Sequence, residues 1–209
     1  MKQYPSIPSS NGTSFREYPH MHIFEKLDGS NLRFEWNGKG GWSKFGSRTQ
    51  LICPETPIYG PAIPLFLKEI GPFIRKKWPK AKTLTAFCEW LGPNSFAGVH
   101  TDPIEDMQLF LIDLTEDKKG FIPAGGFVSA FVGQIPTPDY YGQHNWTRGF
   151  VQRIHDQDFA PMAKDIEGVV GKCKTSPTVT HMAKAKTNWW KEKIKSLYTE
   201  KEAEAMLLS

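Results

Sequence analysis

Cysteine is scarce in this sequence, and long apolar runs are missing. The 209 residues include three cysteines, Cys53, Cys88 and Cys173, far apart and without a Cys-x-x-Cys pair. This spacing supports neither a disulfide framework nor a zinc knuckle. No apolar run approaches the roughly 20 residues that a membrane-spanning helix needs, and the first residues lack the pattern of a signal peptide. We therefore expect a protein of a reducing cytoplasm with no membrane partner.

A strong charge of either sign is also missing. The chain has 26 Lys and Arg against 22 Asp and Glu, a net charge of +4 and a pI near 8.9. This weak basic balance fits a polyanionic partner, and it fits equally an ordinary protein with spare lysines. The hydrophobic fraction of 39% and the aromatic fraction of 13% are those of a folded globular protein. The length, with no internal repeat or clear linker, predicts one domain over residues 1–209.

In the stretch from Phe24 to Asn31, a short apolar run places Lys26 directly before a predicted tight turn. A strand through it places Lys26 on one face and Glu25 on the other, and Asp28-Gly29 predicts the turn. A lysine amine becomes a nucleophile only where neighbouring cations or desolvation lower its pKa. The rest of the chain should therefore supply such neighbours.

Two alternating runs follow, over residues 32–36 and 41–45, joined by Asn37-Gly38. Asn-Gly between such runs predicts a hairpin because type I′ turns need positive φ. The second run continues to Arg48, which we expect at a strand end, where a guanidinium suits a phosphate or a ribose. The alternative for an isolated arginine is an ordinary surface residue.

The middle of the chain predicts a helix and two strands. Apolar residues recur at helical spacing from Pro61 to Trp78, and Gly71-Pro72 should break or kink that helix. Residues 83–90 form a buried strand carrying Glu89, a carboxylate that needs a partner. In a strand over residues 108–114, Phe110 and Ile112 share one face, while Asp113 points to the other with Leu111.

In the last third of the chain, the sequence predicts a strand that carries two lysines on one face. At most one short helix lies between residues 123 and 142, a helix covers 147–155, and a strand over 165–172 has Glu167 at its head. A strand over 181–186 projects Lys184 and Lys186 from the same face, which is unfavourable unless an anion lies between them.

The two ends of the chain differ in character. Residues 1–19 form an irregular lead-in with several prolines. Trp190, Ile194, Leu197 and Tyr198 recur at helical spacing, which predicts one amphipathic C-terminal helix over residues 188–209.

The order of these motifs resembles the covalent nucleotidyltransferase superfamily of polynucleotide ligases and mRNA capping enzymes. A Lys-x-Asp-Gly motif alone is weak, but Lys26-Leu27-Asp28-Gly29 is followed in the usual order by the other nucleotide-pocket motifs. These are Arg48, Phe87-Cys88-Glu89, Phe110 to Asp113, Glu167 to Lys172, and Lys184-Ala185-Lys186.

Within the superfamily, the closest resemblance is to RNA ligases of the bacteriophage nick-sealing type. Glu25 precedes the lysine, and Gly29-Ser30-Asn31 follows it, whereas DNA ligases and capping enzymes usually carry arginine at the position of Asn31. The similarity spans residues 21–187. It implies an α+β fold, an ATP-grasp-like nucleotidyltransferase domain with largely antiparallel sheets forming a nucleotide cleft and with flanking helices.

The resemblance also implies roles around ATP. Lys26 would attack the α-phosphorus and form a lysyl-AMP adduct, while Lys184 and Lys186 neutralise the α-phosphate and favour the free amine. Glu89 would bind the ribose hydroxyls. Glu25 would read the adenine amino group and thereby select ATP over GTP.

Further roles concern the base, the metal and the nucleic acid. Phe110 or Ile112 would cover the adenine face; the family prefers an aromatic residue at the position of Ile112, so this choice stays open. Glu167 would bind Mg²⁺ or Mn²⁺, and Lys172 would contact a phosphate. Asn31 and Arg48 resemble residues that act on polynucleotide ends. AMP would pass to a 5′-phosphate and leave when a 3′-hydroxyl attacks, on RNA or a nicked duplex.

One feature of the family is missing, and two alternatives stand beside the main hypothesis. Such ligases usually carry an OB-fold or a helical module after this domain, and we expect none here, so a partner protein would supply the clamp or the domain acts alone. A GTP-using, capping-type guanylyltransferase is disfavoured by Asn31. A non-catalytic nucleic-acid-binding module is disfavoured by the intact Lys26, Glu89 and Glu167. The expected location is the cytoplasm, or the host's cytoplasm for a phage protein.

Overall fold

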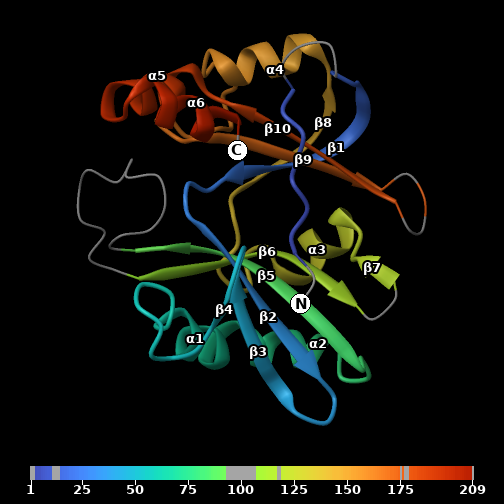
Figure 1. Ribbon diagram of the computed structural model, residues 1–209. Coiled ribbons are helices and arrows are strands. Elements are labelled where there is room, and N and C mark those ends of the chain that lie inside the picture. The colour runs from blue at the N-terminus through green and yellow to red at the C-terminus, as the bar shows by residue number, and fades with distance from the viewer. Residues whose placement is uncertain are drawn as a thin grey trace. The chain divides into compact units, whose positions relative to one another are not determined.

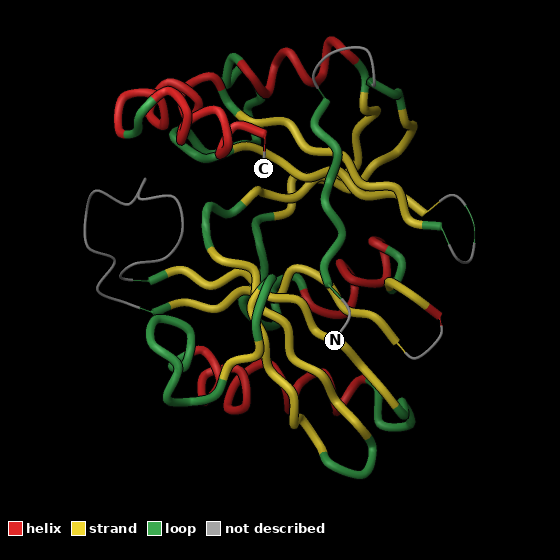
Figure 2. Tube along the Cα trace, viewed as in Figure 1, coloured by secondary structure: helices red, strands yellow, loops and turns green. Residues whose placement is uncertain are grey.

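The computed structural model describes residues 3–10, 15–92, 107–116, 119–174, 176 and 179–208. Their chain divides into two compact units. The first unit comprises the described residues within 1–5, 29–96 and 100–137, and the second comprises those within 6–28 and 138–209. Figures 1 and 2 show that each unit contains a sheet with helices packed on it. The prediction of a single domain stays a prediction.

The first unit contains a six-stranded antiparallel sheet in the order β4-β3-β2-β5-β6-β7. The predicted hairpin over Asn37-Gly38 is confirmed, because it joins β2 to β3. The strands are β2 (Ser30–Asn37), β3 (Gly41–Ser47), β4 (Leu51–Ile52), β5 (Thr83–Leu91), β6 (Gln108–Glu116) and β7 (Gly120–Phe121). The helices are α1 (Ala62–Leu65), the π-helical turn η2 (Phe66–Ile70), α2 (Gly71–Lys77) and α3 (Ala124–Phe131).

One face of this sheet packs on η2, and α1 and α2 lie on the same side (Figure 1). Leu32 and Phe34 of β2 are fully buried, and Phe34 stacks on Phe66 of η2 with ring centroids 3.9 Å apart. Because strand side chains alternate between faces, Asn31 and Glu35 lie on the opposite face. Figure 1 shows α1 and α2 along the same side of the sheet.

The helix predicted from Pro61 to Trp78 exists, but it does not break at Gly71-Pro72. Helical structure runs from Ala62 to Lys77, and the N–H of Gly71 donates to the carbonyl of Phe66, five residues earlier. In an α-helix, a proline ring clashes with the carbonyl four residues before it. The wider π-helical turn directly before Pro72 relieves this clash. Of the two predicted outcomes, a break is therefore wrong, and the irregularity at this point is the π-helical turn.

A β-bulge in β6 overturns the predicted direction of Asp113. Phe87 pairs with Asp113 and Cys88 pairs with Leu111, which leaves Ile112 as the extra residue. A bulge resets the alternation of side chains. Asp113 therefore lies on the face of Phe87 and not on the face of Leu111.

The second unit contains a four-stranded antiparallel sheet in the order β10-β9-β1-β8. Helix α4 contacts it, and together they enclose a core that includes Met21, Ile23, Trp146 and Phe150. With this unit, the predicted class of largely antiparallel sheets with flanking helices is confirmed. The elements are β1 (Tyr18–Lys26), β8 (Tyr140–Trp146), α4 (Arg148–His155), β9 (Gly168–Lys174), β10 (Thr180–Lys186), α5 (Asn188–Leu197) and α6 (Glu200–Leu208).

Two boundaries in the second unit differ from the sequence predictions. The strand predicted over residues 165–172 begins at Gly168, because Asp165 has a left-handed φ of 63°. The single predicted C-terminal helix is in fact two helices, because Tyr198 is extended and α6 begins at Glu200, directly after Thr199. The Thr199 N–H and hydroxyl donate to the Glu202 carboxylate at 3.1 and 2.6 Å. Thr-x-x-Glu is a capping signature that marks this start in the sequence.

Across the described ranges, no helix combines the length and the apolar character needed to cross a bilayer.

Candidate active site

The second unit brings together the lysines of two distant motifs. Lys26 of β1 pairs with Gly168 of β9, and Gly168 pairs with Lys186 of β10. Cross-strand partners share a face of the sheet. Lys26 and Lys186 therefore lie on one face with only a glycine between them.

Glu167 connects these two lysines. Its Oε2 accepts a hydrogen bond from Lys26 Nζ at 2.7 Å, and its Oε1 lies 3.3 Å from Lys186 Nζ. The side chains of Glu167 and Lys186 are 3% and 5% exposed, whereas that of Lys26 is 22% exposed. A buried carboxylate needs such compensation. The arrangement leaves the amine of Lys26 as the accessible end of a buried charge cluster.

Gly168 is required for this approach. A Cβ on Gly168 would lie 2.0 Å from the carbonyl oxygen of Ala185 and 2.8 Å from the Cα of Lys186. Its φ of 156° also lies outside the range that other residues prefer. A side chain here would push β10 away, and Lys186 would move with it.

Lys186 is also fixed by the C-terminal helices. Its Nζ donates to the carbonyl of Met206 at 2.9 Å and lies 4.3 Å from the ring centroid of Trp190. Burial lowers the pKa of Lys186, and the charge of Lys26 lowers it further, while Glu167 raises it. Sequence reasoning missed the contact with Trp190, although the helical spacing of Trp190 predicted that it packs on the body.

Trp190 also holds the Lys-x-Asp-Gly turn through Asp28. Its Nε1 donates to Asp28 Oδ2 at 3.0 Å, within the second unit. One indole therefore contacts both Asp28 and Lys186. The contact with Asp28 is not visible in the sequence, because Asp28 and Trp190 are 162 residues apart along the chain.

Lys184 and Lys172 extend the cationic face. Lys184 pairs with Val170, the cross-strand partner of Phe24, and it is 3% exposed. Lys172 is 6% exposed, and its Nζ lies 5.2 Å from the ring centroid of Phe24. As predicted, Lys184 and Lys186 share a face, with Ala183 and Ala185 buried in the core behind them. This face therefore carries four lysines.

Glu25 lies on the opposite face of β1 from Lys26. Its backbone N–H donates to the carbonyl of Asp139 at 2.8 Å. Burial and the charge of Asp139 raise the pKa of Glu25 to about 7, and the Tyr141 hydroxyl partly offsets this increase. The structure does not bring the Glu25 carboxylate together with the lysines, and its role at adenine stays a prediction.

The first unit places the other predicted residues in a row. Asn31 of β2 pairs with Glu89 of β5, and Glu89 pairs with Phe110 of β6, all on the face away from the helices. Arg48 directly follows the end of β3. Ile112 is the extra residue of the bulge and does not pair with β5. Phe110 is therefore the residue opposite Glu89, and the choice between Phe110 and Ile112 for adenine remains untested.

Two residues on this face were not singled out from the sequence. Tyr4 donates a 2.6 Å hydrogen bond to Asp113 Oδ2, and its ring centroid lies 5.0 Å from that of Phe87. Burial and the charge of Asp113 raise the pKa of Tyr4. Arg33 of β2 is 6% exposed. Alternation with Asn31 would have identified Arg33, whereas nothing in the irregular lead-in marks Tyr4.

The role of Glu167 as a ligand of a divalent cation stays a prediction, because each of its carboxylate oxygens contacts a lysine in this structure. Among the described residues, no group of three or more His, Cys, Asp and Glu side chains forms a complete metal site. Mg²⁺ is commonly held by one or two carboxylates together with substrate phosphates. Glu167, a buried hard-oxygen donor beside Lys26, suits this mode.

Comparison with known proteins shows similarity in structure and not in sequence. No protein-family model and no curated protein matches the chain. A protein assigned as an ATP-dependent DNA ligase from Aquifex aeolicus has a TM-score of 0.62 at 20% identity, over 99% of this chain and 58% of that one. An archaeal ATP-dependent RNA ligase has a TM-score of 0.63 at 17% identity, over 91% and 50%.

A Naegleria gruberi RNA ligase, solved with AMP and Mn, has a TM-score of 0.62 at 13% identity, over 84% of this chain and 52% of that one. The chain thus spans about half the length of the ligase structures that it matches. The fold is that of the nucleotidyltransferase domain of ATP-dependent ligases.

Proposed function

We propose that the protein is an ATP-dependent polynucleotide ligase that acts through a lysyl-AMP intermediate on Lys26. The observation that carries the proposal is the cluster of Lys26, Glu167 and Lys186, with contacts of 2.7 and 3.3 Å, on a sheet of ligase-like fold. The buried cation of Lys186 disfavours a second ammonium beside it, whereas the Glu167 carboxylate favours the ammonium of Lys26 until it accepts the proton. A salt bridge with a purely structural role does not require that Lys26 stay accessible, whereas a nucleophile does, and Lys26 is 22% exposed.

The first step is nucleotidyl transfer to the lysine. The lone pair of Lys26 Nζ attacks the α-phosphorus of ATP, the N–P bond forms, and the bond to pyrophosphate breaks. The amine loses a proton, for which Glu167 Oε2 is the nearest acceptor. Lys184 and Lys186 offset the charge that grows on the α-phosphate oxygens. A divalent cation held by Glu167 would neutralise phosphate charge.

The remaining assignments follow the resemblance. Glu89 takes the ribose hydroxyls, Phe110 or Ile112 covers adenine, and Glu25 reads its amino group. Lys172 binds a phosphate.

Asn31 and Arg48 act on the polynucleotide. AMP moves from Lys26 to a 5′-phosphate, which forms a pyrophosphate linkage, and the attack of a 3′-hydroxyl expels AMP and forms the phosphodiester. Asn31, in place of arginine, supports RNA at one of the two ends, in the cytoplasm or in an infected host.

The test is covalent labelling with α-labelled ATP and Mg²⁺ or Mn²⁺. We expect an acid-labile adduct in the wild type and none in Lys26→Ala. Lys44→Ala, an exposed lysine of the first unit, is the control and should label normally. Absence of any adduct, or an adduct that survives in Lys26→Ala, would overturn the proposal. Labelling with GTP instead of ATP would indicate the capping-type alternative.

Substrate choice requires a second assay. The adenylylated protein is mixed with nicked duplexes that carry RNA or DNA at the 3′-hydroxyl side. We expect faster sealing with RNA, because Asn31 replaces the arginine usual in DNA ligases. Equal or faster sealing with DNA would contradict the RNA assignment and leave the adenylylation chemistry intact.

A further inference from the structure

We propose that the face of the six-stranded sheet opposite α1 and α2 binds the sugar-phosphate backbone of one nucleic-acid strand along β2. This track runs from the row of Asn31, Glu89 and Phe110, past Arg33 and through a hollow lined mainly by polar side chains. It ends at lysines at the far end of the sheet. It rests on the proposed function and extends it to a binding surface. None of the residues beyond the row belongs to the motifs that carry the resemblance.

The register places the track on a single face. Arg33, Glu35 and Asn37 follow Asn31 at every second position of β2. Their partners on β5 are Phe87, Thr85 and Thr83. No register shift interrupts this pairing.

The burial and the unsatisfied donors of Arg33 support an anionic ligand on this face. Arg33 is 6% exposed, and its Nε and Nη1 have no hydrogen-bond partner among the described residues. Buried guanidinium donors without acceptors are costly, because their desolvation is not compensated. Its cross-strand neighbour on β3, Gly46, has no side chain to fill the space beside it. A phosphate oxygen would supply the acceptor, and Arg is well suited to phosphate.

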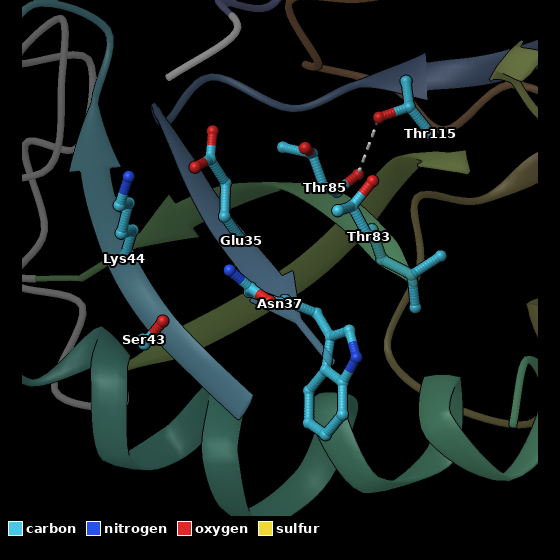
Figure 3. A pocket seen from close by; sticks show the side chains of 9 residues that line it. Glu35, Asn37, Ser43, Lys44, Thr83, Thr85 and Thr115 are labelled. Atoms are coloured by element: carbon cyan, nitrogen blue, oxygen red, sulfur yellow. Dashed lines mark hydrogen bonds between the residues drawn. The ribbon is translucent and has the colours of Figure 1, made fainter. Parts of the chain in front are cut away.

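The hollow follows Arg33 along the same face. Its volume is about 310 Å³. Figure 3 shows Glu35, Lys44, Thr85 and Thr115 pointing away from the helices beneath the sheet. Hydroxyl, amide and lysine side chains are those that proteins use to position phosphates and sugars. The lining residues are Glu35, Trp36, Asn37, Ser43, Lys44, Thr83, Leu84, Thr85 and Thr115.

Three exposed lysines lie at the far end. They are Lys39 in the β2–β3 turn and Lys80 and Lys82 before β5. The Gly38 N–H donates to the carbonyl of Lys82 at 2.9 Å, so the turn and the loop are adjacent. No ion pair links these lysines to another described residue. Their charge is therefore available to phosphates.

Arg75 fixes the loop that carries two of these lysines. Its guanidinium donates to the carbonyls of Trp78, Pro79 and Ala81 at 2.7, 2.8 and 3.3 Å. It also lies 4.1 Å from the ring centroid of Trp36. A loop held in this way presents its charges with little ordering cost.

The chemistry of the face favours a nucleic-acid strand over an acidic protein. Protein interfaces usually depend on buried aromatic or aliphatic anchors. Seven of the nine residues that line the hollow carry hydroxyl, amide or charged side chains, and only Trp36 and Leu84 are apolar. At roughly 3.3 Å per residue, Asn31 to Asn37 spans about 20 Å. This length corresponds to about six nucleotides at roughly 3.4 Å each. A strand that occupies the whole track must therefore extend about six nucleotides from the reacting junction.

The first experiment measures binding to nicked duplexes without the 5′-phosphate, with flanks of three to about twelve nucleotides, at several salt concentrations. In Lys39→Ala/Lys80→Ala/Lys82→Ala, we expect about tenfold weaker binding of long flanks at 0.1 M salt. The slope of log affinity against log salt should fall by about 2 to 3. Flanks shorter than about six nucleotides should show little difference from wild type.

The matched control removes three exposed lysines elsewhere, in Lys68→Ala/Lys195→Ala/Lys201→Ala, with the same change in net charge. An equal loss of affinity in both triple variants would refute the track, because the loss would then follow from the change in net charge alone. Competition by poly-glutamate as effective as that by single-stranded nucleic acid would indicate an acidic protein instead. Covalent labelling by ATP should be normal in both variants. A wild type that fails to label would refute the proposed function, whereas the track is tested by the binding measurements alone.

The second experiment tests Arg33 directly. In Arg33→Gln, we expect normal lysyl-AMP formation, AMP transfer to long-flank duplexes reduced about tenfold, and an unchanged or higher thermal midpoint. Arg33→Lys should restore part of the transfer, because it keeps the charge. A lower thermal midpoint with unchanged transfer would show that Arg33 is structural and would remove it from the track.

Discussion

Glu25 and Lys26 are neighbours in the sequence, yet β1 directs their side chains to opposite faces of the sheet. Lys26 meets the carboxylate of Glu167, whereas Glu25 is partly buried beside Asp139. The pKa of Glu25 rises from 4.5 to about 7 for this reason. Between these pH values, the folded protein binds a proton at Glu25 that the unfolded chain releases.

Proton linkage at Glu25 gives the first prediction of pH dependence. Since its folded pKa is raised, the stabilisation is complete below about pH 4.5 and is lost as the pH rises through about 7. Glu25→Gln cannot ionise, so from pH 5 to pH 8 it should lose about 1 to 3 kcal/mol less stability than the wild type. Thermal midpoints at both pH values measure this difference.

The matched control for Glu25 is Glu17→Gln, at an exposed position. It should follow the wild-type pH profile. If Glu25→Gln also runs parallel to the wild type, Glu25 is ionised in the folded protein at neutral pH. That result would contradict a pKa of Glu25 raised by burial, and it would support the predicted role of the Glu25 carboxylate at adenine.

At the scale of elements, α5 is a support for the charge cluster. The Trp190 indole covers Lys186 with its ring and holds Asp28 with its Nε1. These are separable functions, because phenylalanine keeps a ring and lacks the donor.

Substitution of Trp190 should separate packing from positioning. Trp190→Ala removes a fully buried indole and should cost about 3 to 5 kcal/mol of unfolding free energy. Trp190→Phe should cost less, about 1 to 2 kcal/mol, and lower the rate of adduct formation about tenfold, because Asp28 loses its donor. Chemical denaturation and single-turnover labelling measure the two effects. A normal labelling rate in Trp190→Phe would show that the bond to Asp28 has no role in the chemistry.

Elements whose signal is local could be predicted from the sequence. The hairpin at Asn37-Gly38 and the shared face of Lys184 and Lys186 follow from turn preferences and from the period of two. The bulge at Ile112 could not be predicted, because it depends on the register against β5, which is a tertiary property. The start of α6 could have been read from the Thr199 capping signature.

The contacts that complete the candidate site are long-range. Phe110 opposite Glu89, Trp190 on Asp28 and Tyr4 on Asp113 join segments far apart in the chain. No local pattern encodes such pairs. Motif order nominated the candidate residues, but their partners required the fold.

At the scale of the whole molecule, the Lys-x-Asp-Gly turn is where the chain passes from the second unit to the first. Asp28 belongs to the second unit and Gly29 to the first. Asp28 accepts the bond from Trp190. A Cβ on Gly29 would lie 2.5 Å from the carbonyl oxygen of Trp90, so this position packs directly on β5. Each residue of the Asp-Gly pair is thus fixed within its own unit.

Nucleotide binding should stabilise the folded protein. A ligand that binds only the folded state adds about 2.7 kcal/mol at one hundred times its Kd. For a chain of 209 residues, this corresponds to a rise of about 5 to 10 °C in thermal midpoint. ATP with Mg²⁺ should produce this shift, and Lys26→Ala should retain most of it, because non-covalent binding remains. After removal of free nucleotide, the shift should persist only in the wild type, as the covalent adduct. A midpoint that ATP leaves unchanged, or that GTP raises equally, would contradict a site selective for ATP.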